Sequence, residues 1–246
     1  QSYLQSSYSK ECGFLMSEKI RLKDFPMSFW AANTMEIFER MAWYGFFAVS
    51  SLYISGSVEE GGLGFSHEDR GVLQGVATFF LYLFPVVSGT LADRYGFKKV
   101  LFAAFLILVP AYYLLGQFKL FTTFFFAYML VAIGAGTFKP VIIGTITKTT
   151  NEKTSSMGFG IFYMMVNIGG FIGPIVAGIV RAISWEYVFI ASSIWISFNF
   201  LILAFFYKDP VETTSVQNKK LKDTLSGMVE VLGNGRFFLF VFGLLI

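Results

Sequence analysis

The 246-residue sequence has few of the side chains on which metalloproteins and hydrolytic enzymes depend. It contains a single cysteine, Cys12, and a single histidine, His67. A disulfide framework and a cysteine-based zinc site are excluded, because each needs several cysteines. The HExxH and GxSxG motifs are also missing, which leaves too few reactive groups for a hydrolytic site. We therefore predict no enzyme activity, no metal site and no cofactor.

Charged residues are scarce as well, at 14% of the chain, and neither sign dominates. The 19 Lys and Arg against 16 Asp and Glu give a net charge of +3, which is too small and scattered to suggest nucleic acid as a partner. Hydrophobic residues, in contrast, make up 55% of the sequence and aromatic residues 19%, and the mean hydropathy is +0.62. This composition indicates an integral membrane protein surrounded by a lipid bilayer.

Five uncharged stretches are long enough, or nearly so, to cross a bilayer as helices, which takes roughly 20 apolar residues each. They comprise residues 71–92, 100–118, 120–138, 154–180 and 187–207. Residues 25–58 are long enough for a first crossing but are interrupted by Glu36, Glu39 and Arg40. The sequence therefore predicts an all-α integral membrane protein with six transmembrane helices.

These crossings divide the chain into four predicted parts. Residues 1–24 form a cytoplasmic N-terminal segment without the apolar core of a secretory signal, and residues 25–207 form the six-helix transmembrane bundle. Residues 208–235 form a polar cytoplasmic linker, and residues 236–246 begin a seventh helix that stops about half a crossing short. Six crossings, a linker and the start of a seventh correspond to half of a pseudo-symmetric transporter. We therefore expect a C-terminal helix bundle of the same chain as a partner.

Lysine and arginine in the short loops set the predicted orientation. They are concentrated before the first helix, in the 2/3 and 4/5 loops, and after the sixth helix. The loops on the other side hold only Arg70, Lys119 and Arg181. We therefore expect a multi-pass protein of the inner or plasma membrane whose N terminus is cytoplasmic.

Two smaller patterns have simple packing interpretations. Gly169 and Gly173 form a GxxxG pattern, which is typical of closely packed transmembrane helices. The aromatic residues near the span ends are interpreted as interfacial anchors, and they comprise Tyr112, Tyr113, Trp185 and Tyr187.

The charged residues of the first helix share one face with polar and aromatic residues. This stripe comprises Asn33, Glu36, Glu39, Arg40, Trp43, Tyr44 and Phe47. At 100° per residue these positions span an arc of roughly 140°. A charge facing lipid at the bilayer centre costs about 2.5 to 3.5 kcal/mol, so the stripe is expected to face a bundle interior or a watery cavity.

Lys139 in the fourth helix is the other charge within a span. Its predicted depth in the bilayer is within about one helical turn of that of Glu39. The first and fourth helices are also the matching first helices of two three-helix repeats, where transporter sites tend to form. We therefore predict that these two helices meet and that Lys139 has an anionic partner.

Two interpretations of Glu36, Glu39, Arg40 and Lys139 are open. In the first, they form a buried ion-pair network that only holds the helices together. Such pairs add little stability after desolvation, however, whereas intramembrane ionisable groups are functional candidates by default. In the second, a substrate carboxylate displaces a glutamate from Lys139, and a proton neutralises the released glutamate. This competition would couple transport to a proton gradient.

Residues 36–45, EIFERMAWYG, resemble the ExxERFxYYG signature on helix 1 of the proton-dependent oligopeptide transporter family, in the major facilitator superfamily. Residues 89–99, GTLADRYGFKK, resemble the superfamily's 2/3 loop motif. FKP at 138–140 and FYMMVNIGGFIGP at 162–174 are similar to the family's helix 4 and helix 5 signatures. The resemblance implies the N-terminal half of a transporter that imports di- and tripeptides with protons by alternating access.

The resemblance also implies roles for residues that match the family's motifs. Glu36, Glu39, Arg40 and Lys139 become the proton-coupling network. The implied substrate-binding residues are Arg40, Trp43, Tyr44, Tyr82, Lys139 and Asn167.

The sequence departs from the family pattern at positions that concern the substrate. Trp43 replaces the first Tyr of the signature, Met41 replaces its Phe, and Val141 replaces the Asn that commonly follows FKP. Ordinary dipeptide selectivity is therefore in doubt. The alternative is the same scaffold transporting another small nitrogen-containing or drug-like anion. A sensor that transports nothing would leave the buried charges unexplained.

Asp93, Arg94 and Lys98 in the 2/3 loop also have two interpretations. They either solvate the loop and set the topology, or they form a gate. As a gate, they hold the cytoplasmic helix ends together in one state and release them in the other.

Overall fold

The computed structural model of the chain describes residues 21–210 and residue 235, and these residues contain helices and no strand. The six long helices are α2 (Met27–Ser55), α3 (His67–Tyr95), α4 (Phe97–Gln117), α5 (Phe121–Thr149), α6 (Ser155–Arg181) and α7 (Trp185–Phe205). Two short 3-10 helices, η1 (Leu22–Asp24) and η2 (Val58–Glu60), lie on either side of α2. The predicted all-α fold with six long helices is confirmed. Most of the predicted linker and the predicted seventh helix lie outside the described residues.

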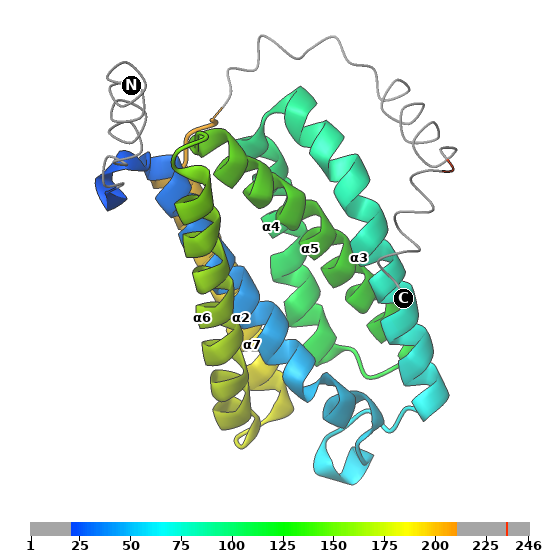
Figure 1. The fold of residues 1–246 in the computed structure, drawn as a ribbon. Coiled ribbons are helices and arrows are strands. Elements are labelled where there is room, and N and C mark those ends of the chain that lie inside the picture. Colours follow the sequence, from blue (N-terminus) through cyan, green and yellow to red (C-terminus); the bar gives the residue numbers. More distant parts are fainter. Residues whose placement is uncertain (1–20, 211–234, 236–246) are drawn as a thin grey trace, which may run out of the picture.

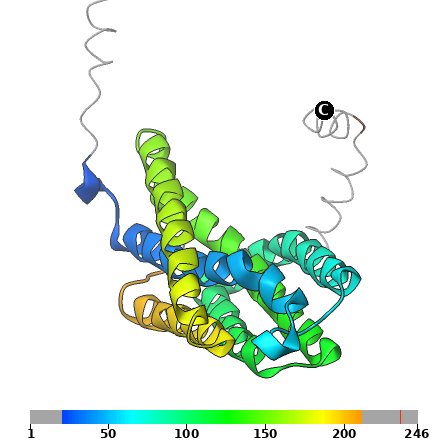
Figure 2. The same ribbon diagram turned by 90° about the horizontal axis from the view of Figure 1, so that it is seen from below.

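The six helices run side by side as a bundle (Figure 1). Helix α2 packs against α6 and α7, α4 packs against both α5 and α7, and α3 packs along α5. Figure 2 shows α3 on the side of the bundle away from α6 and α7. Helices α2 and α5 are in contact, which confirms that the first and fourth predicted helices meet.

Helices α3 to α7 are long and apolar enough to cross a membrane. Helix α2 matches them in length, with 29 residues, but carries Glu36, Glu39 and Arg40 in its middle. All three side chains are buried. Burial against other helices is what allows α2 to carry charge at this depth.

Capping interactions set the ends of α3, which extends beyond the uncharged stretch 71–92. The Ser66 hydroxyl accepts a hydrogen bond from the Asp69 N–H at 3.0 Å, and the Asp69 carboxylate accepts one from the Ser66 N–H at 3.2 Å. This capping box starts α3 four residues before the predicted span. At the other end, Gly96 has φ +94°, which lets the chain turn directly from α3 into α4. Helix α5 likewise continues past the predicted limit of residue 138, to Thr149.

Two of the four predicted interfacial anchors have other contacts. Tyr112 is fully buried, because it lies on the same inner face of α4 as Leu108 and Leu115. Trp185 is half-buried, donates its ring N–H to the Glu60 carbonyl at 3.1 Å and packs against the Tyr53 ring at a centroid distance of 5.1 Å. Nearness to a helix end does not reveal which face of the helix a residue occupies, so the anchor interpretation was wrong for Tyr112.

Candidate functional site

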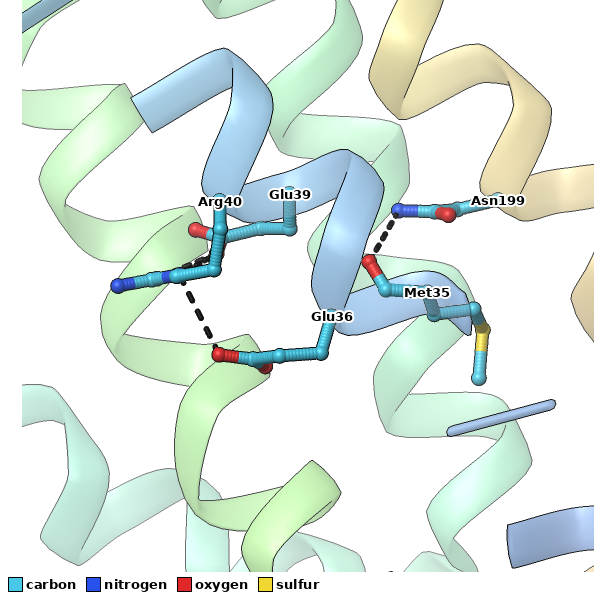
Figure 3. A network of polar contacts seen from close by, with 5 residues as sticks. All are labelled: Met35, Glu36, Glu39, Arg40 and Asn199. Atoms are coloured by element: carbon cyan, nitrogen blue, oxygen red, sulfur yellow. Dashed lines mark hydrogen bonds and ion pairs between the residues drawn. The ribbon is translucent and has the colours of Figure 1, made fainter. Parts of the chain in front are cut away.

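The charged turn of α2 gathers two carboxylates around one guanidinium (Figure 3). The Arg40 Nε lies 3.3 Å from Glu36 Oε1, one helical turn away. Arg40 also forms an ion pair with the neighbouring Glu39 Oε2. Glu36 and Glu39 are 0% exposed and Arg40 is 5% exposed. The group therefore holds two negative charges and one positive charge away from bulk water.

These carboxylates have unused hydrogen-bonding capacity. Among the described residues, both oxygens of Glu36 and the Oε1 of Glu39 have no hydrogen-bond partner. Buried polar groups are usually satisfied by protein or by ordered water, and an ionised carboxylate accepts at both oxygens. The arrangement can therefore exchange partners or take up a proton more readily than a fully satisfied ion pair.

Glycines of α6 bring its backbone against the charged turn. A Cβ added at Gly169 would lie 2.6 Å from both the Arg40 Cβ and the Ile37 carbonyl oxygen. A Cβ at Gly173 would lie 2.5 Å from the Met41 carbonyl oxygen. The close-packing interpretation of the GxxxG pattern is thus confirmed. The same contact fixes the position of the Arg40 Cβ, from which the side chain extends.

Helix α7 contributes two polar contacts to the backbone of α2. The Asn199 amide donates to the Met35 carbonyl at 3.3 Å (Figure 3), and the Ser192 hydroxyl donates to the Ala42 carbonyl at 3.4 Å. Both donors are buried, and their acceptors lie on either side of the charged turn. The sequence interpretation missed both residues. The signal in the sequence was Asn199, an amide side chain within the apolar stretch 187–207.

Lys139 lies on α5, with its side chain exposed. Among the described residues no carboxylate lies within ion-pair distance of it, so the predicted ion pair is not seen. Arg40, rather than Lys139, forms the ion pairs with both glutamates, since it is on the same helix and one turn or less away. The Lys139 charge is nevertheless near enough to act electrostatically on Glu36. It is therefore a cation beside the network.

The residues implied as substrate-binding come only partly together. The Arg40 guanidinium lies 5.6 Å from the centre of the half-buried Tyr44 ring, and Trp43 stacks on Phe47 with ring centroids 6.3 Å apart. These residues share one face of α2, as predicted. Tyr82 on α3 is 76% exposed, and no described hydrogen bond or ion pair joins it to the charged turn.

Asn167 is exposed on α6 and donates to the Tyr163 carbonyl of its own helix at 2.9 Å. It lines a surface hollow of about 690 Å³ together with Gly160, Tyr163, Met164, Ile168, Phe171 and Ile172. All of these residues belong to α6, and no described hydrogen bond joins Asn167 to the other predicted substrate residues.

The 2/3 loop motif joins several helix ends. Asp93 at the end of α3 forms an ion pair of 3.2 Å with Lys148 at the end of α5. The Lys98 ammonium donates to the Tyr207 carbonyl at 3.0 Å, beyond the end of α7. Arg94 instead lies 5.2 Å from the centre of the neighbouring Tyr95 ring. The ion pair of Lys148 was not predicted, because the sequence around a lysine near a helix end does not show whether the lysine is paired.

Asp209 completes this junction by capping a helix to which it does not belong. Its Oδ1 accepts a hydrogen bond from the Lys98 N–H at 2.7 Å, in the first turn of α4. Gly96, the N-cap residue of α4, has no side chain that could cap the helix. An acceptor at this position satisfies one of the free N–H groups of the first turn. The segment after α7 is thereby fixed to the start of α4.

Comparison with known proteins places this geometry in a family. Residues 34–246 match the family model of the Major Facilitator Superfamily. The peptide transporter YePEPT of Yersinia enterocolitica subsp. palearctica is 27% identical over 161 residues, which cover 63% of this chain and 31% of the relative. A di-/tripeptide transporter of Lactococcus lactis subsp. lactis is 25% identical over 228 residues, covering 83% of this chain and 44% of that protein. The chain thus spans less than half of the length of these curated relatives.

Solved structures show the same fold. A crystal structure of the peptide transporter POT in complex with sulfate superposes with a TM-score of 0.72 at 22% identity, over 88% of this chain and 45% of that one. A POT family transporter in complex with 5-aminolevulinic acid gives a TM-score of 0.71 at 22% identity, over 91% of this chain and 49% of that one. The likeness to peptide transporters indicated by the helix 1 signature is therefore confirmed. The chain belongs to the Major Facilitator Superfamily.

Proposed function

We propose that this chain forms the first half of a transporter that imports di- and tripeptides together with protons by alternating access. The observation that carries the proposal is the sharing of one guanidinium by two buried carboxylates, with the cation Lys139 beside them. The names of the curated relatives support the substrate class.

The proposed coupling is a competition for cations. A peptide carboxylate entering the site is attracted by Arg40 and Lys139, the two positive charges near the middle of the bundle. When Arg40 turns toward the peptide, the carboxylates of Glu36 and Glu39 lose part of the positive charge that balances them. A buried carboxylate without a cation is costly, so taking up a proton becomes the favourable way to neutralise it.

The proposed gate is the junction around Asp93. In the described conformation its ion pair with Lys148 ties the end of α3 to the end of α5. Both side chains are partly exposed, so the pair is weak and can open without a large cost. A contact that forms in one state and breaks in the other is what alternation between two conformations requires. On this proposal the gate lies on the cytoplasmic side, where the N terminus also lies.

The alternative substrate is another small nitrogen-containing or drug-like anion. It is favoured by Trp43, which replaces the first Tyr of the helix 1 signature, and by Val141, whose buried side chain offers no hydrogen bond. The similar structure of a POT family transporter in complex with 5-aminolevulinic acid supports this alternative. Competition of unlabelled peptides and small anions against labelled dialanine separates the two candidates.

The test uses a full-length transporter that contains this chain, in liposomes with an inward proton gradient. We expect uphill accumulation of labelled dialanine, and loss of accumulation in Lys139→Ala. The matched control is Lys153→Ala, which removes an exposed lysine in the loop before α6. Accumulation in Lys139→Ala equal to that of the wild type would contradict the mechanism. Absence of uptake by a folded wild-type protein would contradict the peptide substrate.

A further inference from the structure

Several buried polar atoms have no hydrogen-bond partner among residues 21–210. They include the hydroxyl oxygen of Tyr112 and the Oε1 of Glu39. Both side chains are 0% exposed, so bulk water does not reach them. A tyrosine hydroxyl can donate, whereas an ionised carboxylate can only accept. The Tyr112 hydroxyl can therefore donate a hydrogen bond that the Glu39 oxygen can accept.

The two atoms belong to different helices, which meet at the ring of Phe46. Tyr112 comes from α4, and its ring packs edge-on against Phe46 at a centroid distance of 6.3 Å. Phe46 lies two turns beyond Glu39 on the same face of α2. The Tyr112 hydroxyl is also close enough to Glu39 and Arg40 for both charges to act on it.

We propose that the Tyr112 hydroxyl is a second hydrogen-bond donor to the Glu39 carboxylate, directly or through one buried water, and holds it when Arg40 turns to another anion. Tyr112 is then a positioning residue for the proton-accepting group. The identity of that other anion, a substrate carboxylate, rests on the function proposed above. The pairing of Tyr112 with Glu39 does not.

The groups around Glu39 explain why a neutral hydrogen-bond donor would suit its carboxylate. On its own helix it faces Arg40, which it shares with Glu36, and Tyr44 lies against the same guanidinium. From α5, Lys139 acts on Glu36, and Tyr128 lies beside Tyr112. On α6, the glycine backbone at Gly169 lies against Arg40 and Ile37 of α2. A hydroxyl stabilises the ionised carboxylate without adding a charge that would compete with Arg40 or Lys139.

The direct test is infrared difference spectroscopy of the full-length protein as a function of pH. The carboxyl band of Glu39 is identified by its disappearance in Glu39→Gln. Tyr112→Phe removes one oxygen and keeps the ring on Phe46. Without the donor the ionised carboxylate is less stable, so we expect its protonation midpoint to rise by about one pH unit, a tenfold change in proton affinity. Tyr113→Phe, at an exposed tyrosine of the same helix, should leave the midpoint unchanged.

An unchanged or lowered midpoint in Tyr112→Phe would overturn the proposal. Thermal unfolding gives an independent measurement through a double-mutant cycle of Tyr112→Phe and Glu39→Gln. The combined loss in melting temperature should be smaller than the sum of the single losses, and additive losses would also overturn the proposal. Dialanine uptake is measured separately on the same proteins. If the wild type moves no dialanine, the proposed function fails, while the infrared result still decides whether Tyr112 pairs with Glu39.

Discussion

Gly169 of α6 lies directly against Arg40 of α2, so closely that a Cβ on the glycine would be 2.6 Å from the Cβ of the arginine. The same Cβ would also lie 2.6 Å from the Ile37 carbonyl oxygen, which is backbone and cannot rotate away. The packing of α2 on α6 and the position of the charged turn therefore depend on the same residue.

The first prediction is that Gly169→Ala destabilises the bundle and impairs transport. The added methyl group forces α2 and α6 apart, and overpacking of this kind costs about 1 to 3 kcal/mol. Thermal unfolding in detergent measures the loss. Gly178→Ala is the matched control on α6, because a Cβ there would meet nothing within 4 Å. Equal melting temperatures for the two variants would show that the close approach is unimportant.

The second prediction concerns Glu39→Gln. The variant keeps the size of the side chain but cannot gain or lose a proton. We expect accumulation driven by a pH gradient to fall much more than exchange of labelled for unlabelled dialanine, since exchange needs no net proton movement. Glu152→Gln, at an exposed loop position, serves as the control. Equal losses in accumulation and exchange would argue against a proton role for Glu39.

The third prediction is that Asn199→Leu lowers the stability of the bundle by weakening the contact between α7 and the charged turn of α2. The Asn199 amide donates to the Met35 carbonyl, so the variant removes a polar contact between α7 and α2. Interhelical hydrogen bonds in membrane proteins contribute on average about 0.6 kcal/mol and up to about 1.7 kcal/mol. We expect a loss of stability in that range, measured by unfolding.

Ser197→Ala is the comparison for Asn199→Leu, because Ser197 donates to the Ser193 carbonyl of its own helix. It should cost less than Asn199→Leu. A larger cost for Ser197→Ala would mean that the contact between α7 and α2 contributes little.

The fourth prediction concerns Asp209 as the cap of α4. Asp209→Ala leaves the Lys98 N–H without its acceptor and should cost about 1 kcal/mol, the usual effect of losing a helix N-cap. Asp209→Asn keeps an acceptor oxygen and should retain most of the stability. Thermal unfolding of both variants is the measurement. If the two substitutions cost the same, the contact acts through charge rather than as a cap.

The charged stripe on α2 and the meeting of α2 with α5 could be predicted because both follow from general constraints. A lipid-facing charge is costly at the bilayer centre, so Glu36, Glu39 and Arg40 had to face inward. The repeat symmetry of such bundles then placed the first and fourth helices together.

The partners of individual side chains could not be predicted in the same way. Whether Glu36 pairs with Arg40 or with Lys139 depends on side-chain geometry within about 4 Å, and two cations at similar depth look equivalent in sequence. Tyr112 shows the same limit, because a tyrosine near the end of a span is equally compatible with an interfacial and a buried position. The contact between Asp209 and Lys98 joins residues that are 111 positions apart and follows no local pattern.

The most direct test of proton coupling by this charge network is to follow protons while peptide is supplied. A full-length transporter containing the chain is placed in liposomes with a pH-sensitive dye inside and no initial pH gradient. Addition of dialanine outside should acidify the interior of wild-type liposomes and should not do so with Lys139→Ala. Entry of dialanine without acidification would contradict proton coupling, and equal acidification in the variant would contradict the role of the network.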